Sequence, residues 1–155
     1  HLLMKKLFYL SLALCFFTTL ASAQKVTQKD LQGVWALQGL ESEGIYFDLV
    51  KEDVIIPDEI KGLVSADDEA QMRMAIPVLK DSFMKITDNK IEMNMGPDGD
   101  HGVFTLATKD NKNMMTVTMS DGVPDDSEVF FKDKLLHIIN YVDGQKESEL
   151  IYVKK

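Results

Sequence analysis

Residues 90–95, KIEMNM, alternate polar and apolar side chains at every position. In an extended chain successive side chains point to opposite faces, so Ile91, Met93 and Met95 share one face. Such alternation is typical of an antiparallel strand that is buried on one side and solvated on the other. This segment therefore predicts a β-sheet whose inner face is rich in methionine.

Segments with the same character flank this strand on both sides. Residues 82–87 place Met84 and Ile86 on one face, and Asp88-Asn89 supplies a tight turn, so we predict a hairpin with residues 90–95. Polar or glycine-rich turns separate the segments that follow. The other expected strands are residues 34–40, 103–108, 114–120, 128–132, 134–141 and 147–153, with a turn-rich stretch at 96–102 and an acidic loop at 121–127.

One helix is expected between the first strand and the others. The first strand is followed by a long irregular stretch that contains residues 53–56. Ser65 then suits the N-cap of a helix, and acidic residues fill the first turn, where they interact favourably with the helix dipole. Pro77 disfavours helical geometry at Ile76. The predicted helix therefore covers residues 66–75.

These elements predict an all-β fold, an antiparallel meander barrel of about eight strands with one short helix inserted after the first strand. A meander removes its exposed strand edges by closing into a barrel. No repeat or linker divides residues 24–155, so one domain is expected. The inward faces of residues 134–141 and 147–153 stay open, because Leu135-Leu136 and Ile138-Ile139 are adjacent apolar pairs.

Residues 1–23 are predicted to be a cleavable signal peptide, with three extra residues before the expected start at Met4. Lys5-Lys6 is followed by a largely apolar segment at 7–17, and Ala21-Ser22-Ala23 offers small residues for cleavage. The apolar segment is shorter than the roughly 20 residues that a membrane helix needs. We therefore expect export to the periplasm or secretion, and no stable membrane insertion after cleavage.

Cleavage would leave a domain that is more acidic than the whole chain. It removes Cys15, the single cysteine, so the domain at residues 24–155 would contain no disulfide and no thiol site. It also removes two lysines and no acidic residue, so the net charge changes from −8 to −10. Nucleic acids bind to clusters of Lys and Arg. A nucleic-acid partner is therefore not expected.

The first expected strand begins with Leu31-Gln32-Gly33-Val34-Trp35. This Gly-x-Trp opening, followed by a β-meander, resembles the lipocalin and calycin pattern, and in particular the small exported lipocalin-like domains of Bacteroidetes. The resemblance implies that Trp35 packs across the closed end of a barrel. The position of the helix resembles the lid arrangement of fatty-acid-binding proteins, which implies a helix over the barrel mouth.

Methionines dominate the apolar faces of the neighbouring strands. Methionine is flexible and polarizable and adapts to irregular apolar surfaces. We therefore predict an exported lipocalin-like protein whose partner is a small lipophilic ligand in the barrel lumen. The alternative is an envelope interaction protein with a filled barrel and acidic contact loops at 97–102 and 121–127. The expected ligand-binding residues are Trp35, Met84, Ile86, Ile91, Met93, Met95, Met115, Val117 and Met119.

No motif for catalysis or for a cofactor occurs in the chain. Asp98, Asp100 and His101 lie together in a glycine-rich stretch, but their spacing does not match a calcium loop. His137 lies alone in an apolar strand, where a packed histidine is more common than a catalytic base. We expect no enzyme activity, no catalytic residue, no metal site and no cofactor.

Overall fold

The computed structural model describes residues 24–155, which form one sheet of ten strands and three helices. The predicted signal peptide, residues 1–23, lies outside the described residues. The helices are α2 (Gln28–Leu31), α3 (Asp58–Lys61) and α4 (Ala66–Lys80). The strands are β1 (Gly33–Ser42), β2 (Ile45–Asp48), β3 (Asp53–Ile55), β4 (Phe83–Thr87), β5 (Lys90–Met95), β6 (Asp98–Lys109), β7 (Lys112–Thr118), β8 (Pro124–Lys132), β9 (Leu135–Val142) and β10 (Gln145–Lys154).

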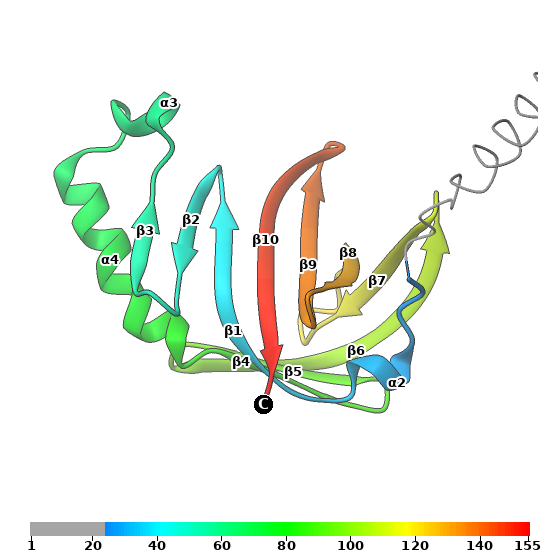
Figure 1. The fold of residues 1–155 in the computed structure, drawn as a ribbon. Coiled ribbons are helices and arrows are strands. Elements are labelled where there is room, and N and C mark those ends of the chain that lie inside the picture. Colours follow the sequence, from blue (N-terminus) through cyan, green and yellow to red (C-terminus); the bar gives the residue numbers. More distant parts are fainter. Residues whose placement is uncertain (1–23) are drawn as a thin grey trace, which may run out of the picture.

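The sheet closes into an antiparallel barrel (Figure 1). From β4 to β10 each strand pairs with the next one along the chain, and β4 and β10 both pair with β1. The pairing of β1 with β10 runs from Trp35 opposite Lys154 to Ser42 opposite Ser148 and completes the ring. Eight strands form the ring, since β2 and β3 extend from β1 outside it. The predicted all-β barrel is confirmed.

Strand β1 changes partners along its length. Residues 33–36 pair with β4, whereas residues 39–42 pair on the same side with β2. The wall therefore divides halfway up, and β2, β3 and α4 form a side structure (Figure 1). Helix α4 packs against β3 and β1, and Ile76 is its buried residue. The implied lid over the mouth is thus not seen, because α4 lies along the side of the barrel.

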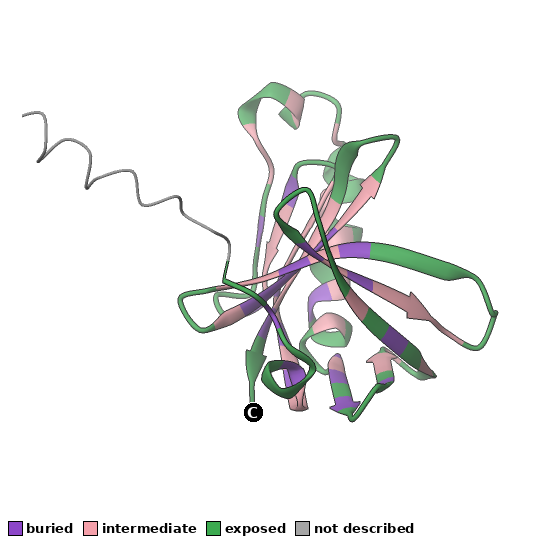
Figure 2. Ribbon diagram, turned by 90° about the vertical axis from the view of Figure 1, so that its right-hand side faces the viewer, coloured by how far each residue is buried: buried purple, intermediate pink, exposed green. Residues whose placement is uncertain are grey.

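Inward and outward side chains alternate along the strands. Figure 2 shows buried positions as short bands separated by half-buried or exposed ones. The buried residues of the ring strands form one cluster, and large side chains fill its part near the closed end. This part of the lumen is solid. Its members include Trp35, Leu37, Phe104, Val129, Leu136 and Tyr152.

The N-terminal segment closes one end of the barrel. The Trp35 indole is 2 % exposed, and its Nε1 donates a hydrogen bond to the Leu31 carbonyl of α2 at 2.8 Å. The backbone N–H of Val26 donates to Asn113 Oδ1 of β7 at 3.1 Å. Lys154 Nζ lies 5.6 Å from the centre of the Trp35 ring. Trp35 therefore lies at the floor, where the resemblance placed it.

A chain of polar side chains supports the closing strands on the outer wall. His137 Nδ1 of β9 lies 2.6 Å from Glu149 Oε1 of β10. Lys146 Nζ donates to Glu149 Oε2 at 2.5 Å and to Glu41 Oε2 of β1 at 3.2 Å. The His137 ring stacks on Phe130 of β8 with a centroid distance of 4.8 Å. Side chains from four strands thus tie the outer surface together where the ring closes.

Three local expectations were wrong. The helix continues through Pro77 to Lys80, because the packing of Ile76 outweighs the one backbone hydrogen bond that proline cannot make. Residues 98–102 are part of β6 rather than a turn, because Gly96-Pro97 alone makes the reversal. The expected acidic loop at 121–127 is shorter, since pairing with β7 begins at Pro124. Strands β2 and β3 were not predicted, since residues 41–64 were expected to be irregular.

Gly102 allows β6 to leave β5 and join β7. A Cβ atom at this position would overlap the backbone carbonyl oxygen of Thr118 and lie 2.8 Å from the Cα of Met119. We expect Gly102→Ala to lower the free energy of unfolding by about 1–3 kcal/mol, since backbone atoms cannot move aside cheaply. Urea unfolding measures this change. The control is Gly99→Ala, where the nearest atom to an added Cβ would be 3.7 Å away. Equal effects of the two variants would contradict the claim that close backbone approach requires glycine at position 102.

Glu149 should make the stability of the barrel depend on pH. Burial alone would raise the pKa of Glu149, but hydrogen bonds from Lys146 and His137 outweigh burial and lower the pKa below its ordinary value. A group whose pKa is lower in the folded state than in the unfolded state stabilises the fold at pH values above its unfolded-state pKa. This contribution is lost as the pH falls through the folded-state pKa.

Glu149→Gln should therefore lower the free energy of unfolding near neutral pH by about 1–3 kcal/mol. The difference from wild type should shrink as the pH falls through the lowered pKa of Glu149 in the folded state, because the wild-type carboxylate becomes protonated. Urea unfolding at several pH values measures it. The matched control is the exposed Glu147→Gln on the same strand. A difference that stays constant with pH would refute the role of the Glu149 charge.

Candidate functional site

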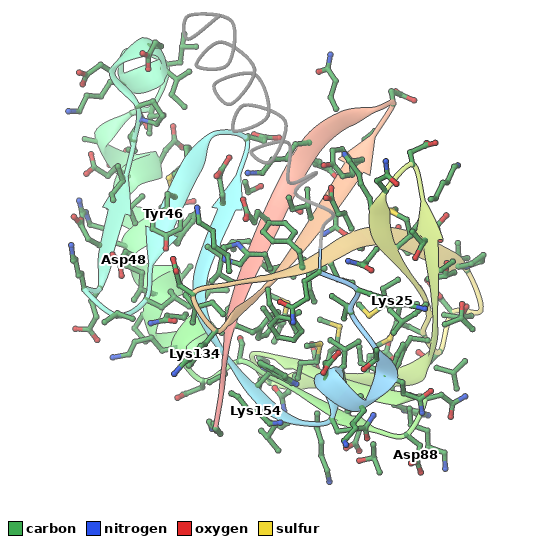
Figure 3. The ribbon with its side chains drawn as sticks, turned by 45° about the vertical axis from the view of Figure 1, so that its right-hand side comes forward. Lys25, Tyr46, Asp48, Asp88, Lys134 and Lys154 are labelled. Carbon is green, nitrogen blue, oxygen red and sulfur yellow. The ribbon has the colours of Figure 1, made fainter. Side chains whose placement is uncertain are left out.

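The half of the lumen away from Trp35 contains a cavity of about 200 Å³. Its wall comes from β4, β5, β7, β8, β9 and β10 and from the turn between β7 and β8. Figure 3 shows a group of sulfur atoms between the barrel strands. The lining residues are Met84, Ile91, Met93, Met115, Val117, Met119, Asp121, Val123, Asp125, Ser127, Ile138, Asn140 and Leu150.

The strand registers explain why these side chains meet. Residues that lie directly opposite each other in an antiparallel pair point to the same face of the sheet. Met84 lies opposite Met93, so β4 and β5 place two methionines side by side in the lumen. Met115 of β7 lies opposite Ser127 of β8, and the same pairing aligns the next inward residues of these two strands. The apolar wall is thus a direct result of period-two alternation.

Six of the nine expected ligand-binding residues line the cavity, namely Met84, Ile91, Met93, Met115, Val117 and Met119. The other three lie elsewhere. Trp35 and Ile86 are buried in the solid part of the lumen. Met95 is 41 % exposed, because it pairs with Asp98 at the very end of the β5–β6 hairpin. Alternation alone could not show that the strand passes the barrel rim at this residue.

Sequence reasoning missed the contribution of β8, β9 and β10 to the cavity. Asp125 and Ser127 belong to a strand that begins earlier than expected. Ile138 and Leu150 lie opposite each other and point inward, which resolves the open choice of face for the last two strands. The inward positions of β8 follow the same period-two rule. They would have been predicted if the strand had been expected to begin at Pro124.

A row of polar side chains crosses the cavity wall. Ser127 Oγ of β8 donates to Asn140 Oδ1 of β9 at 2.5 Å, and Asn140 Nδ2 donates to Ser148 Oγ of β10 at 3.0 Å. Ser127 is only 6 % exposed. The row therefore satisfies its own buried polar groups. It leaves the second N–H of Asn140 as a hydrogen-bond donor in the cavity lining.

Two carboxylates lie at the rim of the cavity. Asp121 is held in the β7–β8 turn, where the Val123 N–H donates to its Oδ1 at 2.9 Å. Asp125 lies opposite the inward Val117, so it shares the inner face. Among the described residues that line the cavity, none is Lys, Arg or His. The described lining of the rim therefore carries two carboxylates and no basic side chain.

The volume limits what the cavity holds. An apolar cavity of about 150 Å³ takes up a benzene-sized molecule in other proteins. The lumen is slightly larger, and the part near Trp35 is filled. A molecule with one ring or a short chain fits inside, and a longer one would project through the mouth between the turns.

Larger hollows lie on the outer surface but are open to solvent. One of about 440 Å³ lies over the outer face of β4, β5 and β6, where Lys85 Nζ is 3.7 Å from Glu92 Oε2. Another of about 460 Å³ lies between α3, α4 and the β1–β2 turn, beside the exposed Leu63. Binding sites for small molecules bury most of the ligand surface. The lumen meets this condition better than either outer hollow.

Residues 24–155 contain neither a cluster of metal-ligating side chains nor a membrane-spanning helix. No three His, Asp or Glu side chains converge there in a way that would hold a metal ion. In the same residues, none of the helices has the length and apolar character needed to cross a membrane.

Comparison of this chain with protein-family models, with curated proteins and with solved structures found no match. The barrel architecture agrees with a calycin-like fold.

Proposed function

We propose that this chain is an exported lipocalin-like protein that binds a small, mainly apolar molecule in the open half of its barrel. The observation that carries the proposal is the cavity of about 200 Å³ above a closed floor, with nine apolar side chains in its lining. A concave cavity with a mainly apolar wall favours apolar solutes over water. Export rests on the signal-like residues 1–23 and is part of the proposal.

The composition of the wall supports binding of more than one shape of ligand. Four methionines, Met84, Met93, Met115 and Met119, contribute to it. Their unbranched side chains repack around differently shaped apolar groups at low cost. The wall between them is fixed by strand pairing, since β4 pairs with β5 and β7 pairs with β8. The protein therefore presents a rigid frame with an adaptable surface.

The alternative, an interaction protein with a filled barrel, agrees with only part of the lumen. Trp35, Phe104 and Tyr152 do fill the end near the floor. The acidic contact loops of that alternative are mostly strand, since β6 includes residues 98–102 and β8 begins at Pro124. Contacts through loops alone would not require the cavity that Ser127 and Asn140 help to line.

Binding of toluene, an uncharged one-ring probe, tests the proposal. At a toluene concentration ten times its Kd, the folded state gains about 1.4 kcal/mol. The melting temperature of the domain should then rise by roughly 3–5 °C. Val117→Phe fills part of the cavity and should abolish the rise, and its melting temperature without toluene shows whether the variant is folded.

The matched control is Val103→Phe, which places the same ring in the outer hollow of β4, β5 and β6. This variant should keep the full response to toluene. If Val103→Phe abolished the response and Val117→Phe kept it, the ligand would bind on the outer surface. If wild type gave no response at any toluene concentration, binding in the lumen would be refuted and the filled-barrel alternative would stand.

A further inference from the structure

The polar groups of the lumen are unevenly distributed around its apolar wall. Asp121, Asp125, Ser127 and Asn140 come from β8, β9 and the adjoining turn, whereas β4 and β5 contribute only apolar side chains. A ligand that places its apolar body against β4 and β5 would direct its polar end to the opposite side. The cavity therefore orients an amphipathic molecule as well as enclosing it.

The charge on this polar side has one sign. Asp125 is held on the inner face by its pairing opposite Val117, and Asp121 is held in the turn by the Val123 N–H. Asp126, which follows Asp125 in β8, points to the other face and accepts a hydrogen bond from Thr116 Oγ1 at 2.5 Å. No basic side chain is present among the described lining residues to compensate Asp121 and Asp125. An anionic group at the rim would meet two carboxylates and no positively charged lining residue.

We propose, building on the proposed function, that the lumen selects its ligand by the charge of the polar end. It binds apolar molecules with an ammonium group most tightly, uncharged alcohols less tightly and carboxylates most weakly. The apolar cavity provides the site, and Asp121 and Asp125 set the preference. The second N–H of Asn140 can donate to a hydroxyl oxygen, so an alcohol is expected to bind more tightly than a carboxylate.

Three molecules with the same ring test this order, namely benzylamine, benzyl alcohol and benzoate, measured near neutral pH by calorimetric titration. We expect benzylamine to bind at least about tenfold more tightly than benzoate. Each of the two carboxylates, at about 5 Å from the charged group of the ligand, attracts an ammonium and repels a carboxylate even in a water-like dielectric. The ratio should fall as salt is added, because both acids lie near solvent.

The double variant Asp121→Asn, Asp125→Asn should bring the benzylamine and benzoate affinities within about threefold of each other, because neutral amides remove the repulsion of the anion. The control Asp126→Asn changes the charge on the same strand but on the other face, and it should keep the wild-type ratio. Toluene, which has no polar end, should bind with the same affinity to wild type, to the double variant and to Asp126→Asn.

The outcomes separate this inference from the proposed function. If toluene binds and benzoate binds as tightly as benzylamine, selection by charge is overturned while binding in the lumen stands. The inference also fails if Asp126→Asn lowers the ratio as much as the double variant. If none of the four molecules binds to wild type, both proposals are refuted.

Discussion

The pairing of β1 with β10 is the constraint on which the rest of the structure depends. It joins residues 35–42 to residues 148–154, near opposite ends of the described chain. Contacts of such long range carry a large loop-closure cost and form late or slowly in folding. Until this pairing exists the meander is an open sheet and has no lumen. The side chains of Glu41, Lys146 and Glu149 compensate part of that cost on the outer wall.

Closure gives a lumen, and side-chain size divides it. Near the floor, the inward positions carry the rings of Trp35, Phe104 and Tyr152, which fill the space. Towards the mouth, they carry smaller or unbranched side chains such as Val117, Met119 and Ser127, which leave a cavity. The same alternation thus produces a solid core at one end and a binding space at the other, as expected for a tapered barrel.

The sequence predicted the fold where the pattern was local. The alternation of residues 90–95 and the turn at Asp88-Asn89 specify a hairpin without help from the rest of the chain, and the hairpin is confirmed. Where tertiary contacts decide, the sequence was insufficient. Buried Ile76 keeps α4 helical past Pro77, and pairing with β1 gives strand character to residues 45–48. Neither effect leaves a periodic signal in the sequence.

The candidate site follows the same division. Met84, Ile91 and Met93 were predicted because their face is fixed by alternation within one hairpin. Ile138 and Leu150 lie among adjacent apolar pairs, so only their register against neighbouring strands reveals which of them point inward. Residues 121–127 were expected to form an acidic loop, so it was not predicted that Asp121 and Asp125 line the cavity. The charge at the mouth is therefore a property of the folded chain.

The most direct test of ligand binding in the lumen is the NMR spectrum of the protein with ¹³C-labelled methionine methyl groups, recorded during titration with toluene. The account predicts that the signals of Met84, Met93, Met115 and Met119 shift together with one Kd. Met74, which is 76 % exposed on α4, and Met95 at the hairpin tip should not respond. Shifts confined to these two exposed methionines, or no shift in the four lumen signals at saturating toluene, would contradict it.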